Sequence, residues 1–251
     1  MLATGALLAP VLVPHDPLAI VAGPLLPPFA DWSVPLGTDR LGRDVLAGLL
    51  YGARVSLLVG LSAAAAALVV GAAVGTAAGF AGGLIDEALM RIVDAFQTVP
   101  GFLLALAFVS VAGPSLGVVV AAIALAAWPA PARLVRGEVL SLRERDFVAS
   151  ARVIGMHPLA IALREVLPNA LPPALALGAT IVAGAILTEA ALAFLGLGDP
   201  NQASWGGMIA EGRTVLRTAP FLSLIPGAAL VATVIGVHLV GEGVAQRRTV
   251  P

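Results

Sequence analysis

The sequence offers few residues that could perform acid–base, metal or nucleotide chemistry. Its 251 residues include three His and no Cys, and all 14 basic residues are Arg. A chain without lysine lacks the GxxxxGK[ST] loop that holds nucleotide phosphates, so any ATP must be bound by another chain. His238 and Glu242 lie four residues apart, and such a pair more often anchors a helix end than binds a metal. We expect no catalytic residue, no metal site and no cofactor in this chain.

The longest polar segment is DFVASARVIGMHPLAIALREVLPN, residues 146–169. Apolar residues in its first half recur at helical spacing: Phe147, Val148, Ala151 and Ile154. This spacing predicts an amphipathic helix. Gly155 can adopt positive φ and end that helix, and Pro158 suits the first turn of a second one. The segment therefore predicts two short surface helices that meet at an angle.

Two interpretations of these helices are open. They could lie flat on the lipid headgroups with their apolar faces inward. They could instead project from the membrane and dock into a cytoplasmic partner. In either case Pro168, Pro172 and Pro173 are expected to close the segment before the chain enters the membrane.

The composition is that of a membrane protein. Hydrophobic residues make up 59% of the chain and charged residues 12%, and the mean hydropathy is +0.99. Soluble domains carry about 25% charged residues, so the lipid bilayer is the expected solvent. The net charge of −1 gives no indication of nucleic-acid binding. We expect an all-α, polytopic transmembrane helical bundle.

Uncharged stretches locate the membrane spans, because a crossing helix needs about 20 apolar residues. They predict five full spans at about 55–80, 97–112, 117–135, 171–196 and 220–241. The second and third spans are separated by a turn at 112–117. Residues 1–14 are apolar but short and proline-broken, and are interpreted as a shortened first span. Residues 1–54 thus comprise this span and an extracytoplasmic segment, and residues 55–251 the transmembrane domain.

Arginine counting sets the orientation. Nine arginines fall on the side that contains residues 133–170 and the C-terminus, against five on the other side. The larger number places the 133–170 loop and the C-terminus in the cytoplasm. In the first full span, Gly71, Gly75 and Gly79 share one helix face and are expected to pack against another helix. Whether that helix belongs to this chain or to a partner is open.

The polar segment resembles the "EAA" loop of bacterial ABC-importer permeases, whose pattern is EAA, three residues, Gly, nine residues and I-x-L-P. Ala149-Ser150-Ala151 stands at EAA, Gly155 at the glycine and Leu167-Pro168 at the final pair. Two positions depart from the pattern, since Ala149 replaces the Glu and Glu165 replaces the Ile.

The resemblance extends along most of the chain and is closest to the dipeptide/oligopeptide/nickel permease family. The matching segments are GTDRLGRDVLAGLLYGARVSLLVG (37–60), LPNALPP (167–173), LTEAALAFLGLG (187–198) and ASWGGMIAEGR (203–213). The resemblance implies a type I-like permease of the bacterial inner membrane. It also implies pairing with a second, homologous permease subunit, with two cytoplasmic ATPase subunits that bind ATP and Mg, and with an extracytoplasmic solute-binding protein.

In such permeases the loop is gripped by the ATPase, and its movement rocks the transmembrane helices. The resemblance therefore implies a docking surface in this chain. Its core would be Phe147, Val148, Ala151, Ile154 and Gly155, and its neighbours Ala149, Ser150, Arg152, Met156, His157, Leu167 and Pro168.

Glu189 lies within the predicted span 171–196. A carboxylate at that depth is a functional hypothesis by default, so it could contact substrate in the pathway or hydrogen-bond within the bundle. The alternative function for the chain is a secondary carrier or channel that does not use ATP. An intramembrane metalloprotease is disfavoured, because the HExxH motif is absent. Trp32, Trp128 and Trp205 are interpreted as anchors at the membrane surfaces.

Overall fold

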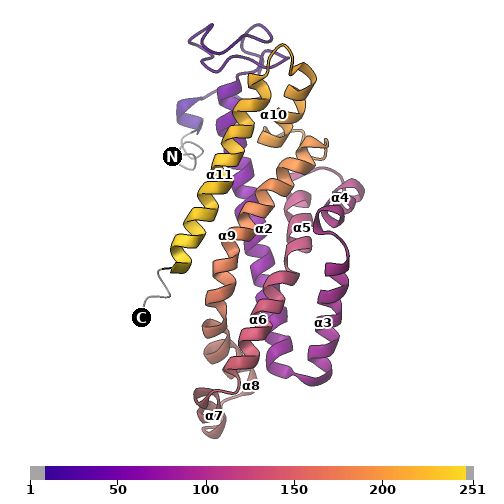
Figure 1. Cartoon of the computed structure of the whole chain (residues 1–251), viewed down its shortest axis with the longest axis vertical. Helices are drawn as coiled ribbons and strands as arrows, with labels where there is room; N and C mark the ends of the chain where they lie inside the picture. The colour runs from indigo at the N-terminus through magenta and orange to yellow at the C-terminus, as the bar shows by residue number, and fades with distance from the viewer. Residues whose placement is uncertain (1–8, 247–251) are drawn as a thin grey trace.

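Helices account for the architecture of this chain. The computed structural model describes residues 9–246, in which the backbone forms helices and loops, two isolated β-bridges and no strand. The long helices run along the longest axis of an elongated molecule (Figure 1). Within residues 9–246, three helices are long and apolar enough to cross a membrane, and five spans result when each of two bent helix pairs is counted as one. The expected shortened first span falls partly on residues 1–8, outside the described part of the chain.

The central helix is α2 (Val45–Ala81), which packs against α6 and α9. It begins at Val45 rather than at residue 55, so the predicted start was too late. Asp44 caps the helix by accepting a hydrogen bond from the Leu46 N–H at 2.8 Å. Arg54 lies within the helix with its guanidinium 5.9 Å from the centroid of the Tyr51 ring. The predicted span began after Arg54 because this residue is charged, but the helix carries Arg54 on its exposed surface.

The second and third predicted spans prove to be bent pairs. α3 (Gly83–Thr98) and α4 (Gly101–Ala112) meet at 83°, while α5 (Leu116–Ala127) and α6 (Pro129–Leu142) meet at 43°. The turn expected between the spans is present, with Ser115 capping α5. The boundaries 97–112 and 117–135 were wrong, because hydropathy excluded the charged helix α3.

The remaining helices are α7 (Asp146–Val153), α8 (Pro158–Ala160), the π-helix η1 (Ile161–Val166), α9 (Leu167–Phe194), α10 (Trp205–Gly212), the short 3₁₀ helix η2 (Arg213–Val215) and α11 (Phe221–Gln246). α7 lies at one end of the molecule, and α10 and the N-terminal extension lie at the other (Figure 1). α10 was not predicted, because its eight residues are too few to show a clear helical period.

The glycine face of α2 packs within this chain. A Cβ atom at Gly71 would lie 2.7 Å from the Pro131 Cγ, and one at Gly79 would lie 2.9 Å from the Val139 Cβ. Gly75 between them lies directly against the backbone of α6 at Ala132. Such distances leave no room for a side chain, so the three glycines allow α2 and α6 to approach closely.

Candidate coupling site

α7 and the turn that follows it form a protruding tip. Arg145 precedes the helix in an extended conformation, and Gly155 ends it with φ +82°. No atom lies within 4 Å of a Cβ placed at Gly155. The glycine is therefore required by its backbone conformation and not by crowding. His157 then begins the next helix, since its Nδ1 accepts a hydrogen bond from the Leu159 N–H at 3.3 Å.

The apolar stripe of α7 is divided between the protein interior and the surface. Val148 is 0% exposed and Ala151 is 6% exposed, and both pack in a core cluster with Val135, Val139 and Ile161. The expectation that Val148 and Ala151 face a partner is therefore corrected. Both side chains hold α7 against α6 and η1. The apolar face of α7 that the sequence predicted is thus covered by the bundle of this chain.

The exposed part of the tip includes three large apolar side chains. Ile154 is 76% exposed and Val153 is 87% exposed, while Phe147 is 38% exposed. The other predicted docking residues divide by exposure: Ala149, Ser150, Arg152, Gly155, His157 and Pro168 are exposed, and Met156 and Leu167 are half-buried. Val153 was missed, because it falls off the stripe that the sequence indicated.

The second helix of the loop continues directly into a helix that is long and apolar enough to span a membrane. From Pro158 the chain is helical without a break to Phe194, passing through the π-helix. The Leu167 N–H bonds to the Ala162 carbonyl, five residues back. The prediction of a second short helix closed by prolines was wrong. Pro168 falls in the first turn of α9, where a missing N–H is tolerated, and Pro172 and Pro173 lie within it.

Arginine side chains brace the helices behind α7. Arg136 on α6 forms two hydrogen bonds with Asp86 on α3, at 2.5 and 2.7 Å. Arg133 contacts Asp94 at 2.6 Å, and the Arg143 Nη1 donates to the Gly79 carbonyl at 2.8 Å. α6, which leads into α7, is thus tied to both α2 and α3. In the sequence these arginines served only to assign which side of the chain faces the cytoplasm. Their carboxylate partners lie on another helix, so no local pattern predicted the ion pairs.

Glu189 lies inside the bundle of this chain. It is 4% exposed, and its Oε2 accepts a hydrogen bond from the Ser56 Oγ at 3.1 Å, which joins α9 to α2. Ser204, at the start of α10, also lies beside the carboxyl group. Within the described residues, Glu189 therefore forms a hydrogen bond between two helices, α9 and α2.

The beginning of α10 is fastened at the same place. Trp205 is fully buried, and its Nε1 donates to the Leu49 carbonyl of α2 at 2.9 Å. Its expected role as a surface anchor was wrong, because its indole fills the space beside Gly52. Trp128 is also buried, at 7% exposure, whereas Trp32 is 81% exposed.

His238 and Glu242 pair on α11 with an Nε2–Oε1 distance of 3.4 Å, and both side chains are more than half exposed. No group of three or more potential metal ligands occurs among the described residues.

The fold of this chain is shared with chains of solved ABC transporters. The inward-facing methionine transporter MetNI has a chain with a TM-score of 0.63 and 19% identity, covering 80% of this chain and 96% of that one. An amino acid ABC transporter matches with a TM-score of 0.59 and 15% identity, covering 80% and 94%.

Residues 47–250 match the family of binding-protein-dependent transport system inner membrane components, and the chain belongs to that family. The "Probable peptide ABC transporter permease protein y4tQ" of Sinorhizobium fredii is 44% identical over 95% of this chain and 81% of its own length. The "Probable D,D-dipeptide transport system permease protein DdpC" of Escherichia coli is 36% identical over 94% and 79%.

The chain is therefore a membrane-embedded permease subunit of an ABC importer, and the transport system depends on an ATPase and a binding protein. The alternative of a carrier or channel independent of ATP is set aside by the family membership.

Proposed function

We propose that this chain forms half of a translocation pathway for peptides and is driven by an ATPase that grips the tip of α7. The cargo is inferred from relatives whose names describe peptide or dipeptide transport. The observation that carries the coupling role is the division of α7 into a buried half and an exposed apolar tip.

The buried half of α7 fixes the orientation of the exposed tip relative to the bundle. Val148 and Ala151 are packed against α6 and η1, so α7 does not swing freely on its own. A push on the exposed Ile154 is therefore transmitted to α6 directly and to α9 through η1. The Arg136–Asp86 pair passes the movement on to α3.

The π-helix is a suitable place for α9 to bend. π-Helical turns interrupt the regular ladder of an α-helix and are frequent at functional sites. Pro172 and Pro173 remove two further N–H donors from the same helix. The Asn169 Nδ2 supports this weakened stretch by donating to the Glu165 carbonyl at 2.6 Å. In this mechanism the bend absorbs the tilt of α7 while the outer half of α9 stays packed.

The assembly follows from the same proposal. A second, homologous permease completes the pathway, and two ATPase subunits, which bind ATP and Mg, contact one tip each. α7 and the C-terminus face the bacterial cytoplasm, as the excess of arginine near α7 supports. The opposite end, with α10 and residues 13–44, faces the binding protein that delivers the peptide.

The contact between the tip and the ATPase can be tested by introducing one negative charge at Ile154. Ile154→Asp should leave the permease in the membrane but reduce recovery of the ATPase on co-purification, because a desolvated carboxylate opposes an apolar contact. Ile20→Asp is the matched control for ATPase recovery, since Ile20 is 72% exposed at the opposite end of the molecule. ATPase recovery and peptide uptake that are normal with Ile154→Asp would overturn the coupling role.

A further inference from the structure

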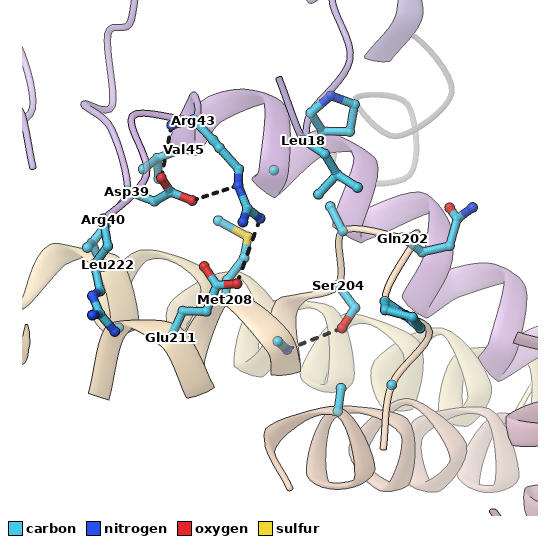
Figure 2. A pocket seen from close by; sticks show the side chains of 18 of the residues that line it. Leu18, Asp39, Arg40, Arg43, Val45, Gln202, Ser204, Met208, Glu211 and Leu222 are labelled. Carbon is cyan, nitrogen blue, oxygen red and sulfur yellow. Dashed lines mark hydrogen bonds and ion pairs between the residues drawn. The ribbon is translucent and has the colours of Figure 1, made fainter. Parts of the chain in front are cut away.

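A cavity of about 250 Å³ lies at the end of the molecule opposite α7. Residues just before α2, the connection between α9 and α10, and α10 itself line it (Figure 2). Pockets for drug-sized ligands measure about 300–1,000 Å³. The cavity is therefore suited to a small molecule or to one end of a larger one.

Most carboxylates on the cavity wall already serve the fold. Asp39 accepts two backbone hydrogen bonds within its own turn, at 2.8 and 2.9 Å. Asp44 caps α2, and Asp199 accepts from two backbone N–H groups at 2.9 and 3.1 Å. Glu211 on α10 differs, because no donor among the described residues makes a hydrogen bond to its carboxylate.

Arg43 likewise has carboxylates nearby but no short hydrogen bond to them. Its Nε lies 3.5 Å from the Asp39 Oδ2, and its Nη1 lies 3.7 Å from the Glu211 Oε1. Charge-assisted hydrogen bonds between such groups are about 2.7–2.9 Å long. The Arg43 side chain is 23% exposed, and within the described residues its guanidinium makes no bond of that length. Arg43 and Glu211 point toward each other from different elements at the cavity (Figure 2).

We propose that this cavity binds an α-ammonium group together with the carbonyl or carboxylate oxygen next to it. The Glu211 carboxylate accepts hydrogen bonds from the ammonium, and the Arg43 guanidinium donates to the oxygen. These two ligand groups are separated by a single Cα atom, which matches a carboxylate and a guanidinium that lie 3.7 Å apart before the ligand enters. The inference rests on the proposed peptide transport and assigns a site to it.

The apolar part of the wall suits a variable side chain. Val45, Met208 and Leu222 line the cavity beside the charged pair. A methionine has three rotatable bonds and a polarizable sulfur, so it adapts to ligands of different shape. The same ammonium–oxygen arrangement occurs at the amino terminus of a peptide and in a free amino acid.

The test is equilibrium binding of radiolabelled trialanine to the permease–ATPase complex in nanodiscs, without the binding protein. Unlabelled trialanine should compete, and N-acetyl-trialanine should compete at least tenfold less well, because acetylation removes the ammonium charge. Glu211→Gln and Arg43→Gln should each weaken trialanine binding about tenfold. Arg217→Gln, an exposed arginine at the same end that does not line the cavity, is the control and should bind as the native chain does.

Each outcome decides the proposal. Competition by alanine as strong as by trialanine assigns the site to free amino acids, and competition by trialanine alone assigns it to peptide ends; both support it. Absence of saturable binding, equal competition by the acetylated peptide, or unchanged affinity in Glu211→Gln would overturn it. ATP-driven uptake measured in parallel tests the proposed function separately, because it can persist when the site fails.

Discussion

Ser56 on α2 donates a hydrogen bond to Glu189 on α9 across 3.1 Å, and both residues are buried. The two residues are 133 positions apart in the sequence. Their contact lies where Trp205 and Gly206 fasten α10 to the same two helices. This end of the bundle is therefore held by polar bonds as well as by packing.

Removing the Glu189 carboxyl group should destabilise the bundle without blocking substrate recognition. Hydrogen bonds between membrane helices contribute about 0.6–2 kcal/mol, and Glu189→Ala should cost an amount of that order in unfolding by SDS titration. Glu189→Gln keeps an acceptor for Ser56 and should cost less. A fall in peptide affinity with normal stability in Glu189→Ala would instead place the carboxylate in the pathway.

A side chain at Gly75 should separate α2 from α6. A Cβ there would lie against the α6 backbone at Ala132, and overpacking typically costs about 1–3 kcal/mol. Gly75→Val is expected to lower the thermal stability of the purified permease. Gly184→Val in α9 is the control, because nothing lies within 4 Å of its added Cβ. Equal stability of the two variants would contradict the close packing of α2 and α6.

Gly155→Val should separate ATP hydrolysis from transport. A β-branched residue is strained at φ +82°, at a cost of about 1–2 kcal/mol, and relief of that strain would reorient α8 relative to α7. Membrane insertion should be normal, while peptide uptake per ATP hydrolysed in proteoliposomes should fall severalfold. Gly137→Val, on an exposed turn of α6 without positive φ, should behave normally. Transport at the native rate in Gly155→Val would count against the docking role.

Exchanging the charges of Arg136 and Asp86 should show whether the brace transmits force. The pair is bidentate and its side chains are 31% and 14% exposed. Arg136→Asp alone places two carboxylates together and should reduce both stability and coupling. Adding Asp86→Arg should recover part of each, measured as melting temperature and as uptake per ATP. No recovery in the double variant would mean that the residues act separately.

The proposed ammonium site should depend on pH. The Glu211 side chain is half exposed, and its partial desolvation raises the pKa of the carboxyl. The Asp39 carboxylate acts in the same direction, while Arg43 and Arg40 lower the pKa. As the pH falls through a raised pKa, the carboxylate becomes neutral and loses its attraction for an ammonium. An ordinary glutamate has a pKa of about 4.3. As the pH is lowered, trialanine binding should therefore begin to decline above the pH at which an ordinary glutamate becomes protonated. In Glu211→Gln the decline should be absent, and the same decline in both proteins would exclude Glu211 as its cause.

The sequence predicted five full spans, which the described residues provide when each bent helix pair is counted as one. It also predicted that the helix α7 ends at Gly155, because apolar length and a glycine after an amphipathic stretch are local features. It misplaced α3, whose charges are compensated by arginines on another helix, such as Arg136 for Asp86. Periodicity identified a face on α7 but not its direction, so Val148 was expected to point outward. The partner of Glu189 lay far away in the sequence, and no local pattern indicated Ser56.

The most direct test of the coupling mechanism uses the absence of cysteine in this chain. Ile154→Cys introduces a single thiol at the tip of α7, and Ile20→Cys introduces one at the opposite end. A short thiol-directed crosslinker should join Ile154→Cys to the ATPase subunit in the assembled transporter, with a yield that changes when ATP is added, and should not join Ile20→Cys. Crosslinking of the ATPase to Ile20→Cys, with none to Ile154→Cys, would contradict the mechanism.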